Sequence, residues 1–127
     1  MTATTESVQL ARAAASAASE KMAEDILAFD VSDQLSIADI FLLCSAQNER
    51  QVDAVVDAVE EELRKYGAKP VHREGERDKR WVLLDYLDIV VHVQHSEERS
   101  YYALERLWRD CPAVDLDVDE PAAGVGS

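Results

Sequence analysis

Two carboxylates and an imidazole in one short stretch have the clearest chemical potential in this sequence. Asp85 and Asp88 interrupt the apolar run WVLLDYLD, and His92 follows shortly after in DIVVHVQ. Carboxylate oxygens bind hard divalent cations, and such cations assist phosphoryl transfer. In a strand-turn-strand unit the three side chains could converge on one cation. A metal-dependent, nucleotidyltransferase-like phosphoryl-transfer enzyme is therefore one hypothesis for this chain.

The sequence lacks the motifs that usually accompany such chemistry. It contains no glycine-rich phosphate loop of the P-loop or dinucleotide type, and no nucleophile elbow. His92 and His95 have HxxH spacing, but side chains three positions apart on one strand point to opposite faces. We therefore expect no catalytic residues, no cofactor and no bound metal.

Aromatic side chains surround the same carboxylates and suggest a different role. The stretch contains Trp81 and Tyr86, and Tyr101 and Tyr102 follow in the next predicted element. Aromatic residues supply contact area at low entropic cost, and acidic groups beside them fix the register of a basic partner. We therefore favour a docking surface over an active site.

The net charge indicates what kind of partner this surface would bind. Asp and Glu total 26 against 13 Lys and Arg, which gives a formal net charge of -13. The densest basic stretch, HREGERDKR, carries nearly as many acids as bases. Nucleic-acid phosphates repel such a chain, so we expect little direct nucleic-acid contact and a basic protein as partner.

The cellular location follows from what the sequence lacks. The N-terminus has no basic segment followed by an unbroken apolar core, and no apolar run approaches the ~20 residues that span a bilayer. Neither cysteine belongs to a CxxC pair, and Cys44 lies in the apolar run IFLLCSA, where we expect it to be core. We expect a cytoplasmic protein without membrane contact.

Hydrophobic periodicity predicts helices in the first half of the chain. Residues 7–23 read as an alanine-rich helix, whose apolar face is Val8, Ala11, Ala15, Ala18 and Met22. A second helix begins at Asn48 and stops at Gly67. Its apolar stripe is Val52, Val55, Val56, Val59, Leu63 and Tyr66.

Strands are predicted at 25–31, at 38–46 and, on a sheet edge, at 69–74. Two further strands, 80–86 and 88–94, form a tight hairpin around Leu87, and alternation puts Val90, His92 and Gln94 on one face. The sheet is therefore mixed, with helices packed against it, in one α/β domain.

The end of the chain changes character. Ser96 is predicted to cap a last helix over 97–110, with the stripe Tyr101, Leu104 and Trp108, and Cys111-Pro112 ends it. We assign residues 1–111 to the domain and residues 112–127 to an acidic, flexible tail. The alternation in AVDLDVD would alternatively add an edge strand.

The segments DILAFDV, SIADIFLLCSAQNERQV, REGERDKRWVLLDYLDIVVHV and YYALERLW together resemble the Iojap family, the ribosomal silencing factors (RsfS-like), over residues 22–110. The resemblance implies a nucleotidyltransferase-like α/β fold without catalytic motifs, and a homodimer. It implies that the protein binds ribosomal protein uL14 of the large subunit. The bound factor would block joining of the small subunit and repress translation under nutrient limitation.

The same resemblance implies which residues contact uL14. Carried over by motif, these are Trp81, Leu84, Asp85, Tyr86, Asp88, His92, Tyr101 and Tyr102. Leu87 replaces the glycine that is usual in the family, and Ala46 stands where the family often has glycine. Glycine adopts positive φ freely and leucine does not. Either the hairpin is wider here, or Leu87 is itself an apolar contact.

Overall fold

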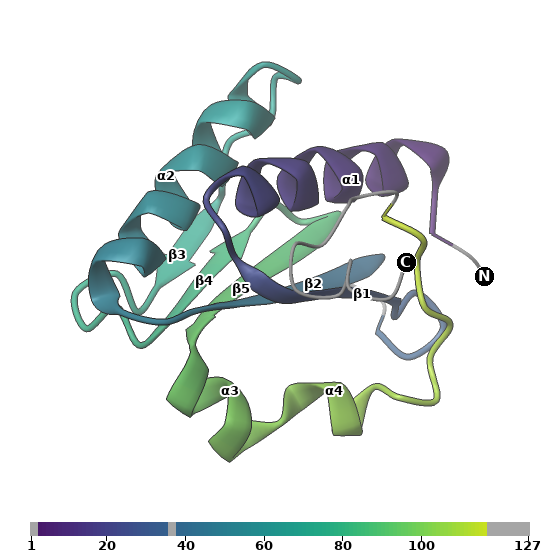
Figure 1. Cartoon of the computed structure of the whole chain (residues 1–127). Coiled ribbons are helices and arrows are strands. Elements are labelled where there is room, and N and C mark those ends of the chain that lie inside the picture. Colours follow the sequence, from purple (N-terminus) through teal and green to yellow (C-terminus); the bar gives the residue numbers. More distant parts are fainter. Residues whose placement is uncertain (1–2, 36–37, 117–127) are drawn as a thin grey trace.

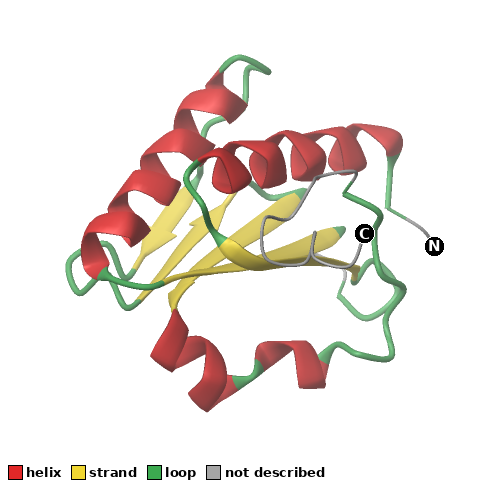
Figure 2. Cartoon of the chain, in the orientation of Figure 1, coloured by secondary structure: helices red, strands yellow, loops and turns green. Residues whose placement is uncertain are grey.

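Two apolar segments that are distant in sequence lie side by side in the middle of a five-stranded sheet (Figures 1 and 2). The computed structural model describes residues 3–35 and 38–116, apart from the side chains of Tyr101, Tyr102, Leu104 and Glu105. The elements in chain order are α1 (Thr5–Glu20), β1 (Glu24–Asp30), β2 (Ile40–Ala46), α2 (Glu49–Arg64), β3 (His72–Glu74), β4 (Trp81–Asp85), β5 (Ile89–His95), α3 (Ser96–Tyr102) and α4 (Leu104–Leu107).

The strand order is β1-β2-β5-β4-β3. The central pair, β2 and β5, is parallel, and the other neighbouring pairs are antiparallel. Helices α1 and α2 cover one face of the sheet, whereas α3 and α4 lie on the opposite side (Figure 1). The predicted mixed α/β fold is confirmed, and so are the edge position of β3 and the core position of Cys44.

Helix α2 follows its predicted pattern closely. The side chain of Asn48 accepts a hydrogen bond from the Gln51 N–H, as an N-cap does. The valine and leucine positions of the predicted stripe are buried. Gly67 has a positive φ of 77° just beyond the end of the helix. Tyr66 was wrongly placed in the stripe: it lies after the helix has ended and is 56% exposed.

Helix α1 packs against α2 through small side chains. Its buried residues are Ser7, Ala11, Ala13, Ala14, Ala15, Ala17 and Ala18. Thr4 provides the N-cap by accepting from the Ser7 N–H. The helix ends at Glu20, so the predicted extension to residue 23 is wrong. Met22 has a φ of 65° and is 61% exposed, because the chain reverses there towards β1.

The last predicted helix is in fact two short ones. Ala103 adopts the left-handed conformation, with φ 44° and ψ 54°, and separates α3 from α4. The N-cap of α3 is His95 rather than Ser96, because the His95 side chain accepts from the Glu97 N–H. Helix propensity alone contains no signal for such a break, since alanine is the best helix former.

The first residues of the predicted tail lie along the outer edge of β1. The Asp30 N–H donates to the carbonyl of Pro112 (2.8 Å), and the Val114 N–H donates to the carbonyl of Ala28 (2.9 Å). This antiparallel contact covers part of a strand edge that would otherwise be open.

Leu116 strengthens this attachment, because it is 8% exposed and belongs to the core beneath α1 and α2. Within residues 112–116, the alternative of an added edge segment therefore describes the structure better than a flexible tail. Residues 117–127 lie outside the described residues, so their assignment to a flexible tail stays a prediction.

Candidate functional site on the second face of the sheet

The predicted site residues divide between the two faces of the sheet. Successive side chains of a strand point to opposite faces. Leu84 and Tyr86 belong to the core beneath α1 and α2. Trp81 and Asp85 alternate with them and point to the opposite side, which we call the second face. A surface that joined all four side chains cannot exist in this fold.

The prediction that Leu84 and Tyr86 are surface contacts is therefore wrong. Leu84 is fully buried, and Tyr86 is only 7% exposed. Burial, with a smaller effect from the nearby Glu60 carboxylate, raises the pKa of Tyr86 to about 12. The Tyr86 hydroxyl has no hydrogen-bond partner among the described residues. Leu84 and Tyr86 therefore attach the hairpin to the core beneath α1 and α2.

On the second face, Trp81 and His92 form a pair. The indole Nε1–H of Trp81 donates to Nδ1 of His92 at 3.1 Å, and the ring centroids are 6.1 Å apart. His92 is 5% exposed, whereas Trp81 is half-buried. His92 is therefore a buried side chain that supports Trp81, and its predicted role as a direct surface contact is wrong.

The pairing and the burial of His92 fix its protonation. Because Nδ1 accepts from Trp81, the neutral ring carries its proton on Nε2. Burial lowers the pKa of His92 to about 4, so the ring is neutral near pH 7. Its Nε2 atom is buried and has no hydrogen-bond partner in the described part of the chain. This imidazole cannot supply positive charge to a ligand at neutral pH.

Asp85 and Asp88 differ in their structural roles. Asp85 is half-buried, and its Oδ1 accepts a hydrogen bond from the backbone N–H of Leu87 at 2.8 Å. Asp88 is exposed, and its backbone carbonyl accepts from the Asp39 N–H at the start of β2. Asp85 therefore shapes the hairpin, whereas the Asp88 carboxylate faces solvent.

The convergence of these carboxylates with His92 on a cation was the structural basis of the enzyme hypothesis. Across residues 3–35 and 38–116, no group of three or more His, Cys, Asp and Glu side chains could hold a metal ion. His95 is occupied as the N-cap of α3. The described residues therefore give no structural support to the phosphoryl-transfer alternative.

Three apolar side chains of the second face were not predicted from the sequence to belong to the site. Phe41, on β2, lies 5.1 Å from His92 and 5.2 Å from Trp108 between ring centroids. Trp81, His92, Phe41 and Trp108 thus form an aromatic row across β4, β5 and β2 to the segment after α4. Leu83 packs on the same face. Strand alternation could have identified Phe41 and Leu83, but not the approach of Trp108.

Tyr101 and Tyr102 end α3, which covers this side of the sheet. Their side chains lie outside the described part of the structure, so their proposed contact with a partner stays a prediction.

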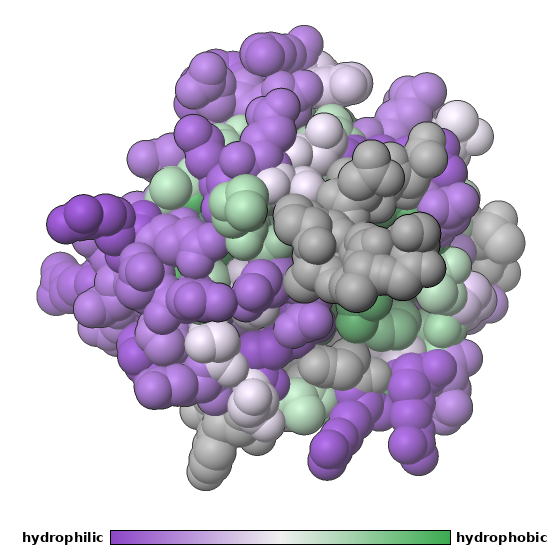
Figure 3. Space-filling model, viewed as in Figure 1, coloured by the Kyte–Doolittle hydropathy of each residue, from purple (hydrophilic) through white to green (hydrophobic). Residues whose placement is uncertain are grey.

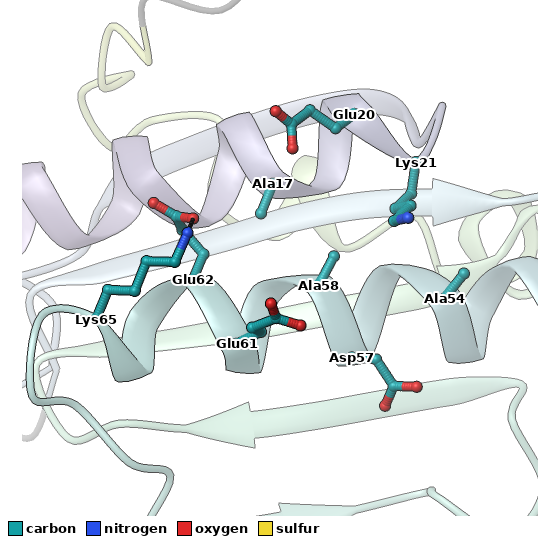
Figure 4. Close-up of a pocket in the computed structure, with 9 residues that line it drawn as sticks. All are labelled: Ala17, Glu20, Lys21, Ala54, Asp57, Ala58, Glu61, Glu62 and Lys65. Carbon is teal, nitrogen blue, oxygen red and sulfur yellow. Dashed lines mark hydrogen bonds and ion pairs between the residues drawn. The ribbon is translucent and has the colours of Figure 1, made fainter.

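A cavity of about 440 Å³ opens on the other side of the molecule, between α1 and α2 (Figure 4). Alanine side chains from both helices face it, and the charged groups around it are Glu20, Lys21, Asp57, Glu61, Glu62 and Lys65. Lys65 pairs with Glu62 at 3.2 Å. None of the predicted site residues lines this cavity.

The surface in Figure 3 is mostly hydrophilic, in keeping with the charged composition.

A protein-family model described as "Ribosomal silencing factor during starvation" (RsfS) matches residues 4–125. The chain belongs to this family. The ribosomal silencing factor RsfS of Bacillus subtilis (strain 168) is 45% identical over 104 residues, which cover 82% of this chain and 88% of the relative. The chloroplastic protein Iojap of Zea mays is 29% identical over 117 residues, which cover 90% of this chain and 50% of the relative.

A solved structure supports the same assignment to the RsfS family. A protein from Chromobacterium violaceum, known from a crystal structure, is 32% identical and superposes with a TM-score of 0.76. The match covers 79% of this chain and 83% of that one. The resemblance seen in the sequence is therefore confirmed, and so is the α/β architecture.

Membership in the RsfS family also bears on catalysis. The names of the relatives describe regulation of the ribosome, which agrees with the expectation of a protein that is not an enzyme. In the described residues, no helix combines the length and the apolar character needed to cross a membrane.

Proposed function

We propose that this RsfS-family protein binds the large ribosomal subunit through ribosomal protein uL14. The bound protein blocks joining of the small subunit and represses translation when nutrients are limiting. It acts in the cytoplasm as a homodimer in free solution, without a cofactor and with little direct nucleic-acid contact. The observation that carries this proposal is the family match over residues 4–125.

The contact surface in this proposal runs along the β4–β5 hairpin, from Trp81 at the start of β4 to the exposed tip at Leu87 and Asp88. Trp81 and Asp85 are half-buried, and Leu87 and Asp88 are exposed. Leu83 and Phe41 extend the apolar area, and Tyr101 and Tyr102 are carried over from the family pattern. An apolar and aromatic centre with carboxylates at its edge suits a basic protein surface. The formal net charge of -13 favours the same class of partner.

A subunit-joining experiment tests the function. Purified large subunits are incubated with the protein, small subunits are added, and the mixture is separated on a sucrose gradient. The protein should sediment with the large subunit, and the peak of joined ribosomes should fall as its concentration rises. An unchanged peak of joined ribosomes, with the protein left at the top of the gradient, would contradict the proposal.

A separate binding measurement tests the partner. Isothermal calorimetry with isolated uL14 should detect a complex that weakens at high salt, because charges at the edge of the surface are screened. Asp88→Asn should weaken the complex by up to about fivefold at low salt, the range expected for an exposed ion pair. Asp57→Asn is the matched control, because it removes one negative charge from the exposed face of α2. Binding to large subunits without binding to uL14 would show that the partner is another component.

A further inference from the structure

The tip of the β4–β5 hairpin presents a leucine in an unfavourable conformation. Leu87 has a φ of 71° and is 58% exposed. The Asp88 N–H donates to the carbonyl of Tyr86 at 2.9 Å, which closes a three-residue turn with Leu87 at its centre. The hairpin therefore has a tight turn at Leu87 and is not widened there. Leucine instead adopts the left-handed conformation that glycine would adopt freely.

Folding alone does not explain this arrangement. A γ-turn with positive φ at its central residue is the rare and strained form, and a leucine at positive φ is uncommon. The exposed side chain also gains little from burial in the isolated chain. Backbone strain of this kind is concentrated at active sites and binding sites, where the surrounding structure holds it in place.

Met22 offers a comparison within the same chain. Among the described non-glycine residues with positive φ, only Met22 and Leu87 carry large apolar side chains. Met22 follows α1, where its N–H donates to the carbonyl of Ser19. A left-handed residue is the usual way to end a helix, so the helix terminus accounts for its conformation. No such terminus is present at Leu87.

Asp85 holds the turn in place. Its Oδ1 accepts from the Leu87 N–H at 2.8 Å, and its backbone carbonyl accepts from the Val71 N–H at 2.8 Å. Val71 is 60% exposed, so a second apolar side chain lies close to the tip. Asp85 Oδ1 therefore already has a partner in the chain's own backbone, and Asp88 is the more exposed carboxylate of the hairpin.

We propose that Leu87 is the anchoring side chain of the docking surface and that Asp85 is a positioning residue, which holds Leu87 outward through its hydrogen bond. The occupant is an apolar depression on the basic protein that the surface binds, and Asp88 contributes charge beside it. This inference rests on the proposed function, in which that protein is uL14 of the large subunit. It assigns to Asp85 a geometric role in place of a direct charge contact.

Substitutions at both positions separate geometry from charge. Leu87→Gly removes the side chain and relieves the backbone, whereas Leu87→Met keeps an apolar side chain. Asp85→Asn keeps an oxygen acceptor without the charge, and Asp85→Ala removes both. Met22→Gly is the matched control, because it relieves a positive φ at an exposed apolar residue elsewhere. Affinity for purified large subunits and for isolated uL14, and the urea midpoint, are measured on the same full-length samples.

The expected pattern is specific. Leu87→Gly weakens binding by about tenfold or more while the urea midpoint stays equal or rises. Leu87→Met binds within about threefold of wild type, and so does Asp85→Asn, whereas Asp85→Ala loses about tenfold. Met22→Gly leaves the affinity unchanged.

Two results would overturn the inference while leaving the proposed function intact. One is wild-type affinity in Leu87→Gly. The other is an equal loss in Asp85→Asn and Asp85→Ala, which would make the carboxylate a charge partner. If the wild-type protein binds neither large subunits nor uL14, the proposed function is wrong, and this inference is wrong as well.

Discussion

The indole Nε1–H of Trp81 donates a hydrogen bond to Nδ1 of His92, 3.1 Å away on the neighbouring strand. The bond joins a half-buried ring at the start of β4 to a buried ring in the middle of the sheet. It also fixes the neutral tautomer of the imidazole. The positions of the surface residue Trp81 and the core residue His92 are therefore coupled, and a substitution of either should alter the packing of the other.

Trp81→Phe tests this unit. Phenylalanine keeps an aromatic ring but leaves the buried Nδ1 of His92 without its donor. We expect the free energy of unfolding to fall by ~1–3 kcal/mol, the cost of an unsatisfied buried polar atom. Urea denaturation measures it. Trp108→Phe, at the other end of the aromatic row, keeps its edge contact with Phe41 and should cost less. Equal losses would argue against the hydrogen bond as the cause.

His92 should make stability depend on pH. The ordinary pKa of 6.5 falls to about 4 in the folded protein, so between these values only the unfolded chain gains the proton. The free energy of unfolding should therefore fall as the pH drops from about 6.5 to about 4, by up to about 3 kcal/mol from this group. In His92→Gln the fall over this window should be smaller by that amount. Identical slopes in the wild type and in His92→Gln would refute the assignment.

Gln94 should be destabilising in the free protein. It is fully buried, and neither side-chain atom has a hydrogen-bond partner in the described part of the chain. Gln94→Met keeps the length of the side chain and removes both polar atoms. We expect the free energy of unfolding to rise by about 1 kcal/mol in urea denaturation. A fall of similar size would mean that the amide is satisfied by internal water.

The attachment of residues 112–116 predicts a sharp boundary for truncation. A chain that ends at Cys111 loses two backbone hydrogen bonds to β1 and the buried Leu116 side chain. We expect this chain to lose ~2–5 kcal/mol of stability. A chain that ends at Leu116 keeps these contacts and should unfold at nearly the wild-type midpoint. Equal thermal midpoints for the two truncated chains would show that the segment contributes nothing.

The proposed homodimer is tested by sedimentation equilibrium. At micromolar concentration the protein should have about twice the mass of one chain, as in a closed two-fold assembly. A dilution series should then show dissociation into single chains. A single-chain mass at every concentration would exclude the homodimer.

Elements with strong hydrophobic periodicity were predictable from the sequence. The α2 stripe from Val52 to Leu63 and the nearly all-apolar β2 were found because burial on one face, or on both, leaves a pattern in residue type. The short spacing around Leu87 was enough to predict the hairpin. The positive φ there was not predicted, because leucine rarely adopts it.

Other features depend on contacts that no local pattern encodes. The break at Ala103 goes against helix propensity. The segment that ends at Leu116 looked acidic and unattached, yet its backbone pairs with a strand far away in sequence. For the site, the signal was present in the sequence. Strand alternation along β4 separates the core side chains Leu84 and Tyr86 from Trp81 and Asp85 on the second face.

The parallel pairing of β2 with β5 has a consequence for how the protein is made. Strand β2 is complete at Ala46, but its partner begins only at Ile89, and β5 is also the strand that joins β4 to the rest of the sheet. During synthesis one edge of an almost wholly apolar strand stays unpaired until β5 has emerged. Long-range pairings of this kind form late and leave the partly made chain open to aggregation. The protein thus passes its most vulnerable stage while it is still attached to a translating ribosome.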